Sequence, residues 1–297
     1  MAVGMMGHAT APVRAYVSVP PHAYFVDRIG GEHVEVGLLV RASDDPHSFN
    51  PTPGQVAGVV RAQLFFRTGM PFEETLVRRL QRATRDIRVV DLREGIDVIE
   101  GIPCAGDHHH SKHGEDSHHH HHHDQEDPHI WLSPRLAAVQ ADHILAALVA
   151  VKPSQESVFR DNHQQLVEDL HALHGRLQEL LEPVRGSDIL VYHAAFGYFC
   201  REYGLRQVPV ETGGREPSPR AIRDLIAQAR ESGTRVIFVQ PQFHDRSAQV
   251  IAEAVGGTVV AVDPLSRDYL NNLEVIGRAF ESSGTRSSDE RISSHSH

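Results

Sequence analysis

The sequence contains few cysteines, no excess of basic residues and no apolar run long enough to cross a membrane. Its 297 residues include two cysteines, Cys104 and Cys200, which are too few for a disulfide framework and lack the paired spacing of a thiolate zinc site. The 29 basic side chains are outnumbered by 39 acidic ones, which argues against nucleic acid or an anionic membrane surface as a partner. A membrane span needs ~20 apolar residues, and no run reaches that length. These absences indicate a water-soluble globular protein.

The N-terminus shows no intact signal peptide. Residues 1–12, MAVGMMGHATAP, have no basic segment followed by an apolar core. This leaves two interpretations: the chain acts in the cytosol, or a leader has been removed from an exported protein.

Short runs rich in β-branched residues alternate with amphipathic stretches along the whole chain. Strands that alternate with helices are typical of parallel sheets, and the pattern occurs twice. We therefore predict an α/β fold of two lobes, each with a four-stranded parallel sheet flanked by helices. The eight predicted strands lie within residues 13–19, 34–40, 63–69, 87–92, 188–196, 205–210, 234–242 and 258–264.

An amphipathic segment with proline at both ends separates the two halves. Its leucines recur at helical spacing over residues 153–183, which predicts one long rigid helix that joins the lobes. The predicted domains are an N-terminal α/β lobe at 13–152 with a histidine-rich loop at 105–127, the linking helix at 153–183, a C-terminal α/β lobe at 184–283 and a disordered tail at 284–297.

The tripeptide Asp-Pro-His occurs twice, each time shortly before a Ser-Pro or Thr-Pro pair. These copies place His47 and His129 before Thr52-Pro53 and Ser133-Pro134, and the same kind of pair recurs at 218–219. Serine or threonine suits a helix N-cap and proline suits the first helical position. Both histidines are therefore expected in loops that run from a strand end to a helix start, where open α/β sheets bind ligands.

The second half places two further candidates at strand ends. His193 follows the apolar run at 188–192, and Asp263 follows the run at 258–262. One histidine or aspartate in such a place is usually structural, but a matched set of three imidazoles and one carboxylate favours a tetrahedral zinc site. His22 and His244 also lie just beyond predicted strands and are weaker candidates.

These features resemble the metal-specific solute-binding proteins of bacterial ABC importers, the zinc and manganese class. The resemblance implies two α/β lobes with the metal between them and, position by position, the ligands His47, His129, His193 and Asp263. Histidine in the third ligand position, here His193, is associated with zinc in that family. The resemblance extends over residues 13–282 and includes RIGGEHVEVGLLVRASDDPHSFNPTP, DPHIWLSP, VYHAAFGYF, EPSP and VVAVDPL.

A histidine-rich segment precedes the second Asp-Pro-His copy. It has almost no apolar residue to bury, so we expect a mobile loop in which imidazoles bind zinc more weakly than the cleft does. Such a loop could raise the local zinc concentration, or it could be an inert insertion. The candidate secondary ligands are His108, His109, His110, His113, His118, His119, His120, His121, His122 and His123.

The resemblance implies that the chain is not an enzyme. The predicted function is capture of Zn²⁺ outside the cytoplasm, in the periplasm, and delivery to an ABC transporter permease that works with a separate ATPase. We expect a monomer. Two alternatives stay open: a zinc-dependent hydrolase with Glu211 or Glu216 as general base, and a cytosolic zinc storage or chaperone protein. Against the hydrolase, the sequence contains neither a His-Glu-x-x-His motif nor a Gly-x-Ser-x-Gly motif.

Overall fold

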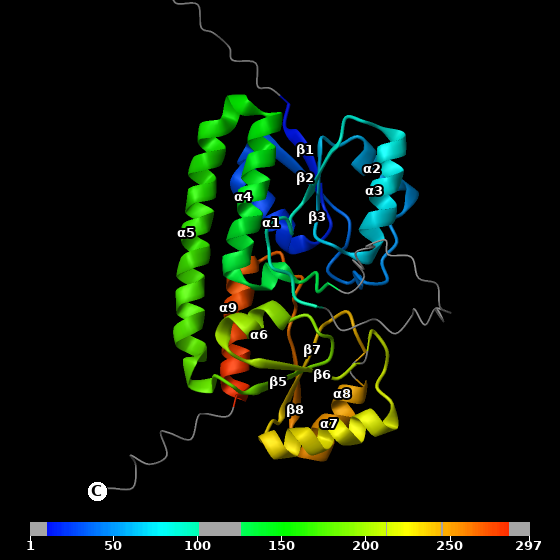
Figure 1. Cartoon of the computed structure of the whole chain (residues 1–297), viewed down its shortest axis with the longest axis vertical. Coiled ribbons are helices and arrows are strands. Elements are labelled where there is room, and N and C mark those ends of the chain that lie inside the picture. The colour runs from blue at the N-terminus through cyan, green and yellow to red at the C-terminus, as the bar shows by residue number, and fades with distance from the viewer. Residues whose placement is uncertain (1–10, 101–125, 212, 245, 285–297) are drawn as a thin grey trace, which may run out of the picture.

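The structure is a computed structural model that describes residues 11–100, 126–211, 213–244 and 246–284. Of the predicted histidine-rich loop, residues 105–125 with all ten candidate histidines lie outside the described residues, and so does the tail from residue 285. Cys200 is described and buried, whereas Cys104 is not among the described residues. Figure 1 shows two lobes along the long axis of the molecule, with helices packed beside them.

The N-terminal lobe is built on a four-stranded parallel sheet with strand order β2-β1-β3-β4. Val13 of β1 is paired with Val34 of β2, and Leu64 of β3 with Arg88 of β4. In chain order the elements are β1 (Val13–Val17), α1 (Pro20–Gly30), η1 (Gly31–His33), β2 (Val34–Leu38), α2 (Pro53–Val60), β3 (Leu64–Arg67), α3 (Pro71–Ala83) and β4 (Arg88–Asp91).

The C-terminal lobe repeats this plan with strand order β6-β5-β7-β8, again all parallel. All eight strands fall inside the predicted runs and are shorter than those runs, and the predicted fold class is confirmed. The elements of this lobe are β5 (Asp188–Val191), α6 (Gly197–Tyr203), β6 (Arg206–Pro209), α7 (Pro219–Ser232), β7 (Val236–Val239), α8 (Arg246–Val255) and β8 (Thr258–Ala261).

Strands β3 and β5 have continuous apolar runs because helices cover both faces of each sheet. Leu64, Phe65 and Phe66 of β3 are fully buried, as are Leu190 and Val191 of β5. A strand buried on both faces cannot alternate apolar and polar residues. This explains why these runs are continuous in the sequence.

The Ser-Pro and Thr-Pro pairs begin helices as predicted. The side chains of Thr52, Ser133 and Ser218 each accept a hydrogen bond from a backbone N–H of the first turn of α2, α4 and α7. Proline occupies the first helical positions of all three helices, where a missing N–H costs nothing. These caps fix where each connection from the sheet edge ends.

Three long helices form a column beside both lobes (Figure 1): α4 (Pro134–Val151), α5 (Glu156–Leu181) and α9 (Tyr269–Ser283). The predicted linking helix is α5, with the 3-10 turns η4 (Pro153–Gln155) and η5 (Glu182–Val184) at its ends. By length and composition α4 alone, among the described helices, could cross a membrane, but it packs on α5 and α1 as a core helix does.

One hydrophobic core runs through the column into both lobes. Leu166, Leu170 and Leu173 on α5 are fully buried in it. At the start of α9 the ring of Tyr269 lies 4.7 Å from that of Phe25 in α1, centroid to centroid. A continuous core of this kind resists large rotations of one lobe against the other, because interiors are close-packed. The predicted domain boundaries remain predictions.

Candidate metal site between the lobes

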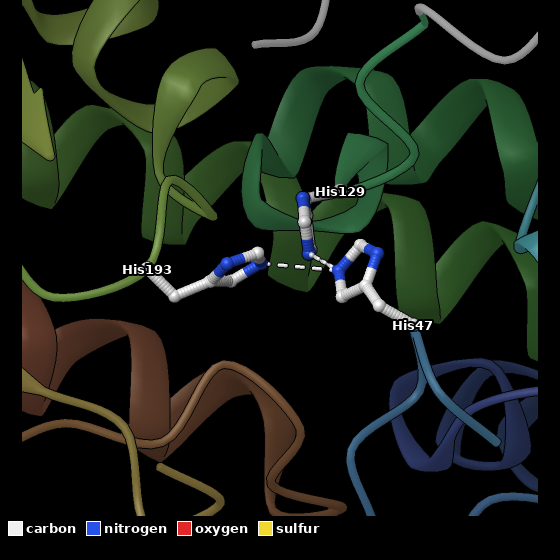
Figure 2. Close-up of side chains that lie close together, drawn as sticks. All are labelled: His47, His129 and His193. Carbon is white, nitrogen blue, oxygen red and sulfur yellow. Dashed lines mark hydrogen bonds between the residues drawn. The ribbon is translucent and has the colours of Figure 1, made fainter. Parts of the chain in front are cut away.

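Three imidazoles from separate segments meet between the lobes (Figure 2). His47 lies in the connection 39–52 between β2 and α2, His129 directly precedes the 3-10 turn η3 (Ile130–Leu132), and His193 follows β5 by two residues. The Nε2 atom of His47 lies 3.3 Å from Nε2 of His129 and 3.0 Å from Nε2 of His193. One ligand atom from each residue lies within 4.8 Å of the other two. The structure thus brings together three of the four predicted ligands.

The spacing of the nitrogen atoms fits a metal ion. Zinc–nitrogen bonds are about 2.0–2.1 Å long, so two nitrogens of a tetrahedral shell are roughly 3.3–3.4 Å apart. The observed separations of 3.0 and 3.3 Å are close to that edge length. Imidazole nitrogens are donors that suit zinc, copper, iron or nickel, whereas calcium and magnesium prefer oxygen.

Buried carboxylates fix the orientation of two of the rings. Nδ1 of His129 lies 2.7 Å from Oδ1 of Asp127, and Nδ1 of His193 is hydrogen-bonded to Oε1 of Glu211. An ionised carboxylate only accepts hydrogen bonds, so both Nδ1 atoms carry the proton and both Nε2 atoms present a lone pair. At least two lone pairs therefore converge on His47, where a cation would be stabilised. Such carboxylate–histidine pairs are the usual support of metal-binding histidines.

The electrostatic environment keeps His47 and His129 in the form that binds a metal. Burial lowers the pKa of His47 well below its usual value, and the imidazoles of His193 and His129 lower it further. Burial also lowers the pKa of His129, although the carboxylate of Asp127 acts in the opposite direction. A neutral imidazole is the metal-binding form, so the donor nitrogens of His47 and His129 stay available in mildly acidic solution.

Asp263 lies two residues beyond β8 at the same edge, but outside the three-histidine group. Its Oδ1 accepts hydrogen bonds from the backbone N–H of Leu265 at 2.9 Å and from Nε2 of Gln242 at 3.3 Å. Both bonds use the same oxygen, and Oδ2 is not involved in them. Asp263 as fourth ligand therefore stays a prediction.

The two weaker histidine candidates are not part of the group. His22 is fully buried and its ring packs edge-on against Trp131, with centroids 5.6 Å apart. Burial lowers the pKa of His22 to about 3, so it is a neutral core residue. His244 is exposed beyond β7.

The two carboxylates considered as general bases are both engaged. Glu211 accepts the Nδ1 proton of His193, and Glu216 accepts hydrogen bonds from the hydroxyls of Tyr192 and Ser247. Glu211 thereby orients the imidazole of His193, which is the role of a carboxylate that supports a metal-binding histidine.

The segment around His129 is hydrogen-bonded to the C-terminal lobe through its backbone and through a side chain. The hydroxyl of Tyr198 in α6 donates to the carbonyl of Asp127 at 2.9 Å, and the indole N–H of Trp131 donates to the carbonyl of Pro264 at 2.8 Å. Pro264 directly follows Asp263 in the chain. His129 comes before α4 in the sequence, yet its neighbours are tied to the other lobe.

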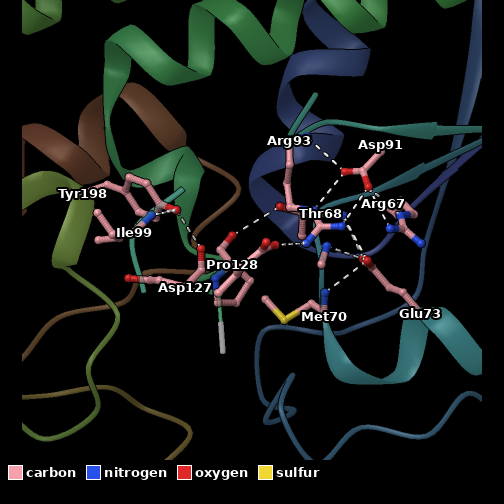
Figure 3. A network of polar contacts seen from close by, with 12 residues as sticks. Arg67, Thr68, Met70, Glu73, Asp91, Arg93, Ile99, Asp127, Pro128 and Tyr198 are labelled. Atoms are coloured by element: carbon pink, nitrogen blue, oxygen red, sulfur yellow. Dashed lines mark hydrogen bonds and ion pairs between the residues drawn. The ribbon is translucent and has the colours of Figure 1, made fainter. Parts of the chain in front are cut away.

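The same segment is held from the N-terminal side by the polar network of Figure 3. Arg93 forms an ion pair with Glu126 at 2.8 Å, and Thr68 donates from Oγ1 to the carbonyl of Pro128 at 3.2 Å. The loop that carries Thr68 is shaped by Glu73, a fully buried carboxylate that accepts hydrogen bonds from three successive backbone N–H groups at 68–70. Burial raises the pKa of Glu73, although these donors oppose the effect.

Sequence reasoning missed the residues that support the ligands. Asp127 was considered only as part of the Asp-Pro-His motif, and Glu211 only as a possible base. Gln240 was not singled out, although its amide accepts from the N–H of His193 at 3.1 Å and donates to its carbonyl at 2.8 Å. The ring of Phe243 stacks on the His193 imidazole at 4.9 Å. A signal was available for Glu211, because it follows β6 at the same sheet edge as His193.

Fold and geometry together define a class: a two-lobed α/β binding protein with a donor set for a transition metal between its lobes. The chain belongs to the family described as zinc-uptake complex component A, periplasmic (ZnuA), whose model matches residues 16–282. The resemblance predicted from the sequence is thereby confirmed.

Individual relatives agree with this assignment. The chain is 30% identical over 268 residues to the high-affinity zinc uptake system protein ZnuA of Bacillus subtilis, covering 89% of this chain and 79% of that protein. It is 28% identical over 265 residues, 89% of each chain, to a putative metal-binding protein of Chlamydia trachomatis. A crystal structure of ZnuA superposes with a TM-score of 0.82 at 30% identity, covering 92% of this chain and 100% of that one. A ZnuA deletion mutant with zinc bound gives the same score and identity, with 93% and 99% covered.

Proposed function

We propose that this chain captures Zn²⁺ between its lobes and delivers it to the permease of an ABC importer. His47, His129 and His193 supply nitrogen ligands and Asp263 supplies a carboxylate from the C-terminal lobe. The observation that carries the proposal is the convergence of three Nε2 atoms from two lobes, at separations of 3.0 and 3.3 Å for the two closest pairs. Family membership supports zinc as the ion.

Family membership supports a proposal for the partners and the location. An importer of this kind consists of the binding protein, a membrane permease and a separate ATPase, so we propose that the chain works outside the cytoplasm, in the periplasm, as a monomer. It carries out no chemical reaction on its cargo: with four protein ligands, no coordination position remains for a reactive water. A storage protein would not need two lobes that meet at one ion.

The ten histidines at 108–123 form a second proposed zinc site, weaker than the site between the lobes. A chain that must be ordered on binding loses part of the binding free energy to conformational entropy. Zinc held there would raise the concentration available to the cleft.

Metal analysis of three proteins tests both sites. The full chain, His193→Ala and a deletion of 108–123 are purified without added metal, and bound zinc is measured by elemental analysis and by competition with a chelator. We expect one tightly bound zinc in the full chain and in the deletion protein, and none in His193→Ala. Tight zinc that persists in His193→Ala, or disappears with the deletion, would refute the cleft as the high-affinity site.

A further inference from the structure

The turn 240–243 after β7 contacts three of the segments that carry the predicted ligands. Gln240 holds the backbone of His193, and Phe243 stacks on its imidazole. Gln242 extends from the same turn, is half-buried, and reaches two other segments. A short turn that contacts three of the ligand segments can couple their positions to one another.

Gln242 joins the two lobes beside the histidines. Its Nε2 donates to the carbonyl of Ala42 at 2.6 Å and to Oδ1 of Asp263 at 3.3 Å. Ala42 lies in the connection 39–52 that carries His47, and Asp263 belongs to the C-terminal lobe. An amide has two N–H donors, so one side chain can make both bonds at once.

The connection 39–52 depends on such a bond more than the other ligand segments do. The His129 segment is tied to the C-terminal lobe through Tyr198 and Trp131. The hydrogen bonds of the His47 segment are mostly local, such as the one from the N–H of His47 to Asp45. A contact that joins this segment to the opposite lobe therefore resists its outward movement.

We propose that Gln242 is a positioning residue that slows zinc release by tying the His47 segment to Asp263 across the mouth of the site. The inference rests on the proposed function and specifies which segment moves when the ion leaves. Zinc dissociates when the connection 39–52 separates from the C-terminal lobe, and this separation breaks the bond from Gln242 to Ala42. His193 stays with the C-terminal lobe, and His129 stays in place because its segment is held from both lobes.

The test is the rate of zinc release from the full chain loaded with one equivalent of Zn²⁺. Excess EDTA is mixed rapidly with wild type, Gln242→Leu, Gln242→Glu and the control Gln164→Leu, and the loss of bound zinc is followed with time. Gln164 lies on the exposed face of α5, where its amide donates to Glu168. We expect release to be about 3- to 10-fold faster in Gln242→Leu, as for the loss of one or two net hydrogen bonds, and unchanged in Gln164→Leu.

Gln242→Glu separates hydrogen bonding from shape. It keeps the size of the side chain but removes both donors and adds a negative charge beside Asp263, so release should be at least as fast as in Gln242→Leu. The association rate of zinc should not fall, because the variants favour the open arrangement. A misfolded site would instead bind zinc more slowly and hold less than one equivalent.

Release at the wild-type rate in either variant, with one equivalent still bound, overturns the role of Gln242 and leaves the proposed function intact. Absence of tight zinc from the wild type refutes the function itself.

Discussion

The two Asp-Pro-His copies share a local sequence and differ in what surrounds them. In both, the aspartate Oδ1 accepts a hydrogen bond from the backbone N–H of the histidine, at 2.9 Å for Asp45 and His47 and at 2.9 Å for Asp127 and His129. The local turn is therefore the same, and proline restricts the backbone in the same way.

Beyond this turn the two copies have different neighbours. Asp45 is partly exposed and its second oxygen accepts from the hydroxyl of Ser48, whereas Asp127 is buried and accepts the ring proton of His129. The packing around Asp127 is close: a Cβ atom at Gly197 would lie 2.7 Å from its Oδ2. One copy is a turn at the edge of the cleft, and the other is a fixed part of its base. We infer that His129 is the preorganised ligand and His47 the movable one.

The largest expected difference between the copies is in the effect of neutralising each aspartate. Asp127→Asn keeps the oxygen that caps the backbone but removes the charge that orients His129, so zinc affinity should fall by about 10- to 100-fold. Asp45→Asn changes only a turn, and the loss should stay below about threefold, within the range of ordinary surface substitutions. Competition with a zinc indicator measures both affinities, and thermal unfolding of the metal-free proteins checks their folding. Equal losses of zinc affinity would show that Asp45 and Asp127 support their histidines to the same extent.

The local part of this comparison could be predicted from the sequence, and the long-range part could not. Strand and helix positions follow from apolar runs and from Thr52, Ser133 and Ser218 as caps, which act within a few residues. The convergence of the histidines follows from the rule that parallel strands end at one edge. The different surroundings of Asp45 and Asp127 depend on residues that are distant in the sequence and follow no fixed spacing, such as Tyr198, which is 71 positions from Asp127. The pairing of Glu211 with His193 and of Gln242 with Ala42 is likewise set by tertiary packing.

The next effect is the pH dependence of the metal-free protein, in which the two histidines should differ. Burial lowers the pKa of both, so the unfolded chain binds more protons than the folded chain once the pH falls below about 6.5, and the free energy of unfolding decreases with falling pH. Each histidine contributes at most about 1.4 kcal/mol per pH unit, and less where it is partly exposed.

For His47 the neighbouring imidazoles add to the lowering, whereas for His129 the carboxylate of Asp127 opposes it. The loss of stability caused by His47 should therefore extend to lower pH values than the loss caused by His129. Urea unfolding of metal-free wild type, His47→Gln and His129→Gln at pH 7, 6 and 5 tests this. His47→Gln should flatten the decline more than His129→Gln does; the reverse order would contradict the electrostatic difference between the copies.

The smallest effect concerns the anchor of the His129 segment in the C-terminal lobe. Tyr198→Phe removes the hydrogen bond to the carbonyl of Asp127 and leaves the N–H of Ile99, which donates to the same hydroxyl at 3.1 Å, without that partner. We expect a loss of about 1 kcal/mol in the free energy of unfolding and roughly a threefold loss in zinc affinity.

Tyr203→Phe is the matched control, because Tyr203 also lies in α6 and its buried hydroxyl contacts His174 rather than the site. Both variants should lose stability, but only Tyr198→Phe should lose affinity, since only there does the hydroxyl hold the backbone of Asp127, two residues before the ligand His129. An affinity loss of the same size in Tyr203→Phe would mean that general loosening of α6, and not the anchor at Asp127, governs the position of His129.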